Sequence, residues 1–157
     1  MRYRIILLTF FILTISQKTL ACDCNSEGEF LKVAPTSDFV SLIKVTKYLT
    51  FKDIEGTQTP MSMEVEIIDI YKGKETKKTV VVWGDNGIQC RPYLSRFKPG
   101  EYYVIAFFKE SQVDYFISIC GDYWLHADIK KQIANGVVTE KQNQIKLADL
   151  KAKLETK

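Results

Sequence analysis

Alternating apolar and polar residues predict a chain built mainly of β-strands. The clearest strand spans residues 61–71, where one side carries Met61, Met63, Val65 and Ile67 and the other carries Ser62, Glu64 and Glu66. The alternation slips at Ile67-Ile68, after which Ile68 and Ile70 take over the apolar side. Such a slip predicts a β-bulge, which bends a strand around a barrel corner; the alternative is a strand end buried on both faces.

The remaining pattern predicts four more strands and three helices. The strands span residues 38–48, 79–83, 102–108 and 115–120, with a long exposed hairpin loop at 49–60. A capping box of Ser26 and Glu29 predicts a short helix through Val33 that Pro35 ends. Helices are also expected at 128–134 and 140–154, the last with a leucine stripe that packs on the barrel (Leu147, Leu150 and Leu154). The predicted fold class is therefore all-β with flanking helices, a five-stranded Greek-key barrel of the OB type.

The N-terminal residues predict a signal peptide over residues 1–21. Two arginines precede an apolar run at 5–15, and Thr19-Leu20-Ala21 forms a cleavage motif that would make Cys22 the first mature residue. A membrane anchor needs about 20 apolar residues, and Gln17 and Lys18 end this run too early, so no transmembrane segment is expected in the mature chain. Lipid attachment at Cys22 is the rival, although Leu20 stands two residues before the cysteine instead of three. We expect a secreted, periplasmic or extracellular protein, with a domain at 22–135 and a helical extension at 136–157.

Charge and residue types argue against several functions. The chain has 22 basic and 19 acidic residues, and removing Arg2, Arg4 and Lys18 with the leader leaves 19 of each. A near-neutral mature surface disfavours nucleic acid as a partner. His126 is the only histidine, and no nucleophile is placed beside it by any motif. Neither a phosphate loop nor a dinucleotide motif is present, so we expect no enzyme and no cofactor.

Four cysteines, Cys22, Cys24, Cys90 and Cys120, predict disulfide bonds. An even count in an exported chain favours two bonds. A Cys22–Cys24 bond would close a strained ring, which leaves two pairings open. A structural zinc site is disfavoured because Cys90 and Cys120 stand far apart.

Several motifs coincide with those of one known family. They are Cys22-x-Cys24 after the leader, Tyr71-Lys72-Gly73 closing a strand, the run Pro99-Gly100-Glu101-Tyr102-Tyr103-Val104-Ile105-Ala106, and Ile117-Ser118-Ile119-Cys120 followed by Tyr123-Trp124. Over about residues 22–135 the chain thus resembles the N-terminal inhibitory domain of the tissue inhibitors of metalloproteinases, within the netrin-like superfamily. The resemblance implies the pairings Cys22–Cys90 and Cys24–Cys120.

The resemblance also implies a mechanism, in which the Cys22 α-amine and carbonyl bind the catalytic zinc of a metalloproteinase partner and displace its water. Asp23 would enter the pocket beside the zinc, where the family usually has Thr or Ser. Cys24 would hold the N-terminal residues in place through its disulfide bond. Ile88 and Gln89 would contact the other side of the protease's active-site cleft. The family's third disulfide and its cysteine-rich C-terminal domain are absent from this sequence. The alternative is a non-inhibitory OB-fold module, or a surface lipoprotein, that holds a protein or glycan partner.

Overall fold

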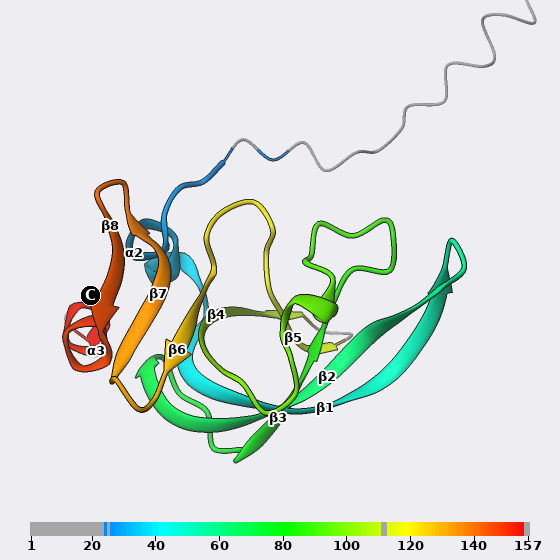
Figure 1. Ribbon diagram of the computed structural model, residues 1–157, viewed down its shortest axis with the longest axis horizontal. Coiled ribbons are helices and arrows are strands. Elements are labelled where there is room, and N and C mark those ends of the chain that lie inside the picture. The colour runs from blue at the N-terminus through cyan, green and yellow to red at the C-terminus, as the bar shows by residue number, and fades with distance from the viewer. Residues whose placement is uncertain (1–23, 25, 111–112, 156–157) are drawn as a thin grey trace, which may run out of the picture.

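Five strands close on themselves in the computed structural model, which describes residue 24, residues 26–110 and residues 113–155 (Figure 1). They are β1 (Phe39–Ile54), β2 (Thr57–Lys72), β3 (Thr79–Trp83), β4 (Tyr102–Glu110) and β5 (Val113–Phe116). Their order is β1-β2-β3-β5-β4, and a pairing of β1 with β4 closes the ring. Only β3 and β5 run parallel among these neighbours. This confirms the predicted five-stranded Greek-key barrel of the OB type.

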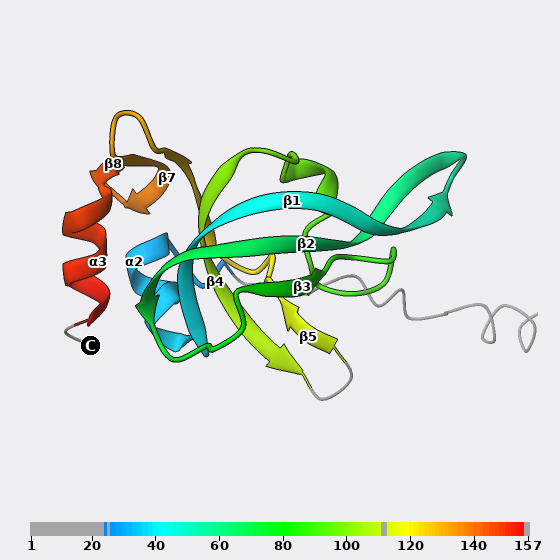
Figure 2. The ribbon, with the colours of Figure 1, turned by 90° about the horizontal axis from the view of Figure 1, so that it is seen from below.

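Strand β1 closes the barrel because it pairs along both edges. Its first residues face β4, from Phe39 opposite Phe107 to Lys44 opposite Tyr102, while the whole strand faces β2. Beyond the barrel, β1 and β2 continue together as a two-stranded ribbon (Figure 2). The loop predicted at 49–60 is therefore wrong, since this segment is strand apart from a tight turn at Glu55-Gly56.

The predicted bulge in β2 is confirmed. Leu42 pairs with Asp69 and Ile43 with Ile67, so Ile68 is the extra residue. Ile70 packs against the core as expected, but Ile68 is exposed, which contradicts its predicted place on the apolar side. A bulged residue leaves the ladder and turns its side chain out of the alternation.

The chain after residue 123 is mostly strand. The strands β6 (Trp124–Asp128), β7 (Ile133–Thr139) and β8 (Gln142–Lys146) extend the sheet from β4, and α3 (Leu147–Glu155) follows. The helix predicted at 128–134 is wrong, and that predicted at 140–154 begins only at Leu147. Strand β7 also runs across the domain limit expected at residue 135. The strand predicted at 115–120 is found at 113–116.

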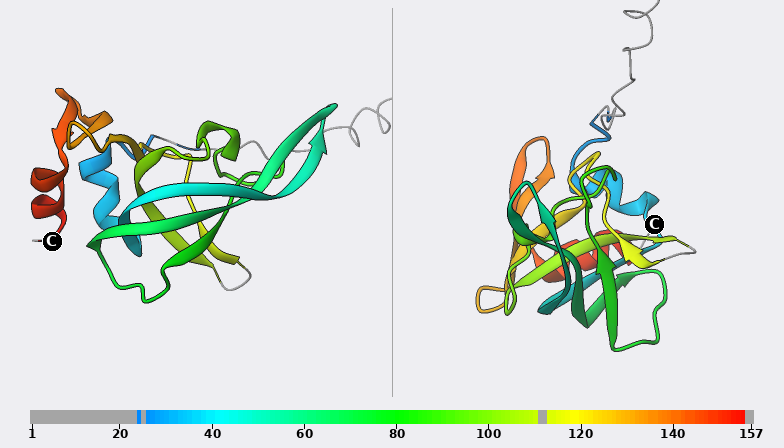
Figure 3. Two further views of the ribbon diagram at one scale, coloured as in Figure 1. Left: turned by 60° about the horizontal axis from the view of Figure 1, so that its bottom comes forward. Right: turned by 90° about the vertical axis from the view of Figure 1, so that its right-hand side faces the viewer.

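The short N-terminal helix α2 (Phe30–Val33) packs against β7 at the end of the molecule where α3 also lies (Figure 3). It ends where predicted, but Pro35 then belongs to a 3₁₀ turn, η1 (Ala34–Thr36). The expected capping box is wrong, because Glu29 is the N-cap residue and makes no side-chain cap hydrogen bond.

Aromatic rings fill the barrel, and leucines hold α3 to the main body. Phe39, Phe107 and Tyr115 are almost fully buried, with ring centroids 5.6–5.7 Å apart. The predicted leucine stripe of α3 is buried, and Lys151 Nζ binds both carboxylate oxygens of Asp69 in β2 at 2.7 and 2.9 Å. No helix in the described part of the chain is long and apolar enough to cross a membrane.

Candidate functional site

Three segments that are distant in the sequence meet at one end of the barrel. They are residues 24 and 26–28, the loop 84–90 that follows β3, and the link 117–122 between β5 and β6. All three lie along the upper side of the molecule in Figure 1. We call them together the N-terminal edge.

A disulfide and two backbone hydrogen bonds fasten the first segment to the third. Cys24 is bonded to Cys120, with their Cα atoms 4.9 Å apart. The Glu27 amide donates to the Cys120 carbonyl at 2.7 Å, and the Asp122 amide donates to the Gly28 carbonyl at 3.0 Å. The chain that follows Cys24 is thus held in register against residues 120–122, much as an added strand would be.

The loop 84–90 is organised by the carboxylate of Asp85. One of its oxygens accepts hydrogen bonds from the backbone amides of Gln89, at 2.7 Å, and of Gly87, at 3.1 Å. This turn presents Ile88 to solvent with 81% of its surface exposed, an unusual position for a large apolar side chain. The Ile119 amide donates to the Cys90 carbonyl at 3.2 Å, which joins the loop to the third segment.

The structure places three of the five predicted contact residues. The predicted pairing of Cys24 with Cys120 is confirmed. Ile88 is at the exposed tip of its loop, and Gln89 is half-buried beside it. Cys90 is also disulfide-bonded. Its predicted partner, Cys22, lies outside the described residues together with Asp23, so the role proposed for these two stays a prediction.

Sequence reasoning missed Arg91, which directly follows the loop 84–90 and holds its end in place. Its guanidinium is 8% exposed, forms an ion pair with Glu110 of β4, and lies 4.6 Å from the ring centroid of Phe116. A buried cation of this kind needs both the opposite charge and the aromatic face to offset its desolvation. The two partners come from the strands β4 and β5, distant in the sequence, so no local motif could have indicated them.

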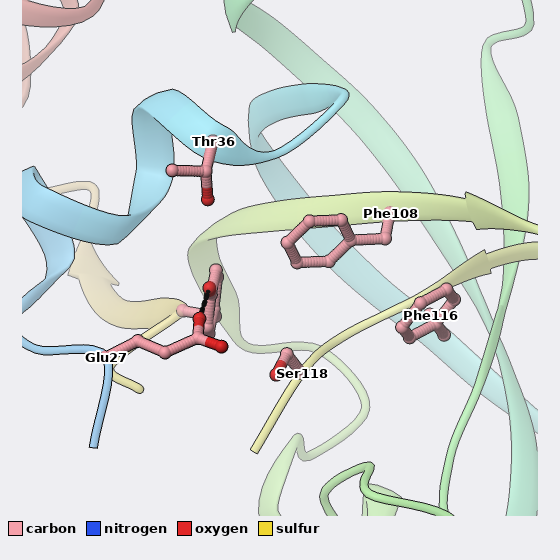
Figure 4. Close-up of a pocket in the computed structure, with 6 residues that line it drawn as sticks. Glu27, Thr36, Phe108, Phe116 and Ser118 are labelled. Carbon is pink, nitrogen blue, oxygen red and sulfur yellow. Dashed lines mark hydrogen bonds between the residues drawn. The ribbon is translucent and has the colours of Figure 1, made fainter. Parts of the chain in front are cut away.

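A pocket of about 490 Å³ opens beside the N-terminal edge (Figure 4). The described residues that line it are Glu27, Thr36, Phe108, Phe116, Ser118 and Tyr123. Phe108 and Phe116 stack with centroids 5.6 Å apart and form one wall. The Glu27 carboxylate faces them across the space and accepts a hydrogen bond from the Tyr123 hydroxyl. The pocket is therefore apolar on one side and acidic on the other.

The hydroxyl groups of the pocket remain donors at neutral pH. Burial, and then the hydrogen bond to Glu27, raise the pKa of Tyr123 to about 12, so its phenol stays protonated. The Ser118 oxygen accepts a hydrogen bond from the Cys120 amide at 3.1 Å, which leaves its own proton for a ligand. This serine also ties the pocket to the disulfide of the N-terminal edge.

Neither a protein-family model nor a curated protein sequence matches the chain. Its function is therefore inferred from its fold and from the N-terminal edge. His126 makes contacts typical of a surface histidine, with its Nε2 atom 3.8 Å from Glu101 and its ring edge-on to Tyr103. No cluster of three or more potential metal-ligating side chains is found within the described residues.

Proposed function

We propose that this protein is an exported binding module that inhibits a zinc metalloproteinase with its N-terminal edge. The observation that carries the proposal is the attachment of Cys24 to Cys120, together with the two backbone hydrogen bonds made by residues 120 and 122. Cys22 stands two residues before Cys24, and two residues span at most about 7 Å of chain. Because Cys24 is bonded to Cys120, the mature N-terminus must lie within this distance of Cys24.

In this proposal the α-amine and the carbonyl of Cys22 bind the partner's zinc and displace its catalytic water. An α-amine titrates at about 7.7–8.0, so part of it is neutral at physiological pH, and binding to the metal releases the remaining proton. The edge is already ordered by its disulfide and hydrogen bonds, which lowers the conformational entropy lost on docking. The exposed side chain of Ile88 adds an apolar contact on the far side of the protease's active-site cleft.

The chemical state of Cys22 decides whether the mechanism can operate. We would measure the intact mass of the exported, unreduced protein and then test it against a panel of zinc metalloproteinases. Adding one alanine before Cys22 converts the amine into an amide and is expected to abolish inhibition. Equal inhibition by the extended protein, or no inhibition of any panel member by a protein with a free Cys22 amine, would contradict the proposal.

Two substitutions test the rest of the contact surface. Asp23→Thr is expected to strengthen inhibition, because an unpaired carboxylate in an apolar protease pocket is costly. Ile88→Ser is expected to weaken inhibition. Val137→Ser is the matched control, since this exposed apolar side chain of β7 lies outside the N-terminal edge. If both serine variants weaken inhibition equally, the loop 84–90 is not part of the interface.

A non-inhibitory module that holds a protein or glycan partner is the second candidate. The pocket lined by Glu27, Phe108 and Phe116 favours it, because this pocket needs no free amine. A lipid adduct on Cys22 in the same mass measurement would block zinc binding and select this function, with the protein anchored at a membrane surface.

A further inference from the structure

The pocket beside the N-terminal edge has the composition of a site for a cation with an apolar stem. Among the six described residues that line it, Glu27 carries the one charge, and the opposite wall consists of the Phe108 and Phe116 rings. Its volume of about 490 Å³ falls within the range of about 300–1,000 Å³ that is usual for ligand pockets. The Tyr123 hydroxyl donates to the Oε2 atom of Glu27, so the carboxylate keeps Oε1 as a second acceptor.

An aromatic ring and a carboxylate together hold a cation at three places in the described residues, with a lysine at two of them (Lys109 and Lys151) and an arginine at the third. Arg91 places its guanidinium over the Phe116 ring and pairs with the Glu110 carboxylate. A planar guanidinium stacks on aromatic rings and gives parallel hydrogen bonds to a carboxylate, whereas an ammonium offers a strongly hydrated point charge. The pocket again combines an aromatic ring with a carboxylate, with Glu27 as the carboxylate and Phe108 as the ring, beside the Phe116 ring that already carries Arg91.

We propose that this pocket receives an arginine side chain of a partner protein. The aliphatic stem lies against Phe108 and Phe116, and the guanidinium donates to Glu27. The Thr36 hydroxyl, which donates its proton to the Val33 carbonyl and also lines the pocket, can accept one of the remaining N–H groups. This inference goes beyond the proposed function and requires neither zinc nor a free amine at Cys22.

The direct test is an NMR titration of the oxidised protein with three blocked amino acids: Nα-acetyl-arginine N-methylamide and its citrulline and lysine counterparts. The arginine probe is expected to shift resonances of Phe108, Phe116 and Ser118. It should bind at least about tenfold more tightly than citrulline, which keeps the shape and loses the charge. Added salt should weaken the binding. Equal binding of citrulline would overturn the role of Glu27, and equal binding of lysine would overturn the choice of a guanidinium.

A variant pair tests the named carboxylate. Glu27→Gln keeps an oxygen that can accept from Tyr123, and it is expected to weaken the arginine probe about tenfold. Glu140→Gln removes an exposed carboxylate from the β7–β8 turn and is expected to leave the affinity unchanged. Undiminished binding by Glu27→Gln would refute the site. If that variant fails to fold, the comparison of arginine with citrulline on the unaltered protein still decides the question.

Discussion

The substitution Gly73→Ala is expected to disturb the start of β1, where the pairing of β1 with β4 closes the barrel. The φ of Gly73 is +80°, and an added Cβ would lie 2.5 Å from the Asp38 carbonyl oxygen and 3.3 Å from the Cα atom of Phe39. Both atoms are backbone at the start of β1, where the Asp38 amide also donates to Phe107 in β4. The methyl group therefore cannot be accommodated by turning a side chain.

Gly56 is a matched control for the conformational part of this cost. Its φ is +79°, yet nothing lies within 4 Å of an added Cβ. An L-residue in the left-handed region costs about 1–2 kcal/mol, offset by about 0.4–1 kcal/mol because alanine restricts the unfolded chain. Gly56→Ala should thus lower the free energy of unfolding by about 1 kcal/mol.

The substitution Gly73→Ala should cost about 2–4 kcal/mol in total, because crowding of the backbone adds about 1–3 kcal/mol. Urea unfolding of both variants, followed by circular dichroism, measures the two values on one scale. If the two variants lose equal stability, the contact of Gly73 with residues 38 and 39 is not what limits this position.

Three further predictions concern stability. Leu150→Ala should cost about 2–4 kcal/mol in urea unfolding, because this side chain of α3 is fully buried, whereas the exposed Lys153→Ala should cost almost nothing. The Lys77 amide and the Tyr115 hydroxyl hold the pKa of Glu75 below its usual value. Its stabilisation is therefore complete above about pH 5 and lost as the pH falls through the lowered pKa, so Glu75→Gln should flatten the acid limb of a plot of stability against pH; an unchanged limb would contradict this. Burial raises the pKa of Tyr71 and of Tyr103 to about 12. Stability should therefore fall as the pH rises from about 10 to 12, and a flat alkaline profile would show that these phenols ionise without opening the fold.

The barrel could be predicted because β3 and part of β2 alternate between buried and more exposed residues, while β1 and β4 are mainly apolar and aromatic runs whose barrel residues are buried on both faces. The ribbon at 49–60 could not, because it projects from the barrel and all of it except Thr59 and Pro60 is at least partly exposed; its polar residues then resemble those of a loop. The secondary structure after residue 127 was predicted wrongly for another reason. Ile145 pairs with Ala134 in a hairpin, while Leu147, Leu150 and Leu154 begin a helical stripe immediately afterwards. The hydrophobic pattern changes from the two-residue period of a strand to the 3.6-residue period of a helix, with no turn signal between them.

The candidate site was predictable only in part. Cys24–Cys120 followed from the family resemblance, since residue spacing alone left two pairings open. The pocket depends on Glu27 and Tyr123, which are 96 positions apart in the sequence. Arg91 likewise gives no local signal, because a buried arginine and a surface arginine look alike until their partners are placed.

The double pairing of β1 also affects how the chain reaches its folded state. The β1–β2 ribbon is local and can form as soon as residue 72 has been synthesised, but the strand that closes the barrel, β4, begins only at Tyr102. Until then the edge from Phe39 to Lys44 is an open row of hydrogen-bonding groups that can pair with another chain. A substitution that delays closure would therefore promote aggregation during synthesis, even where the finished barrel is as stable as before.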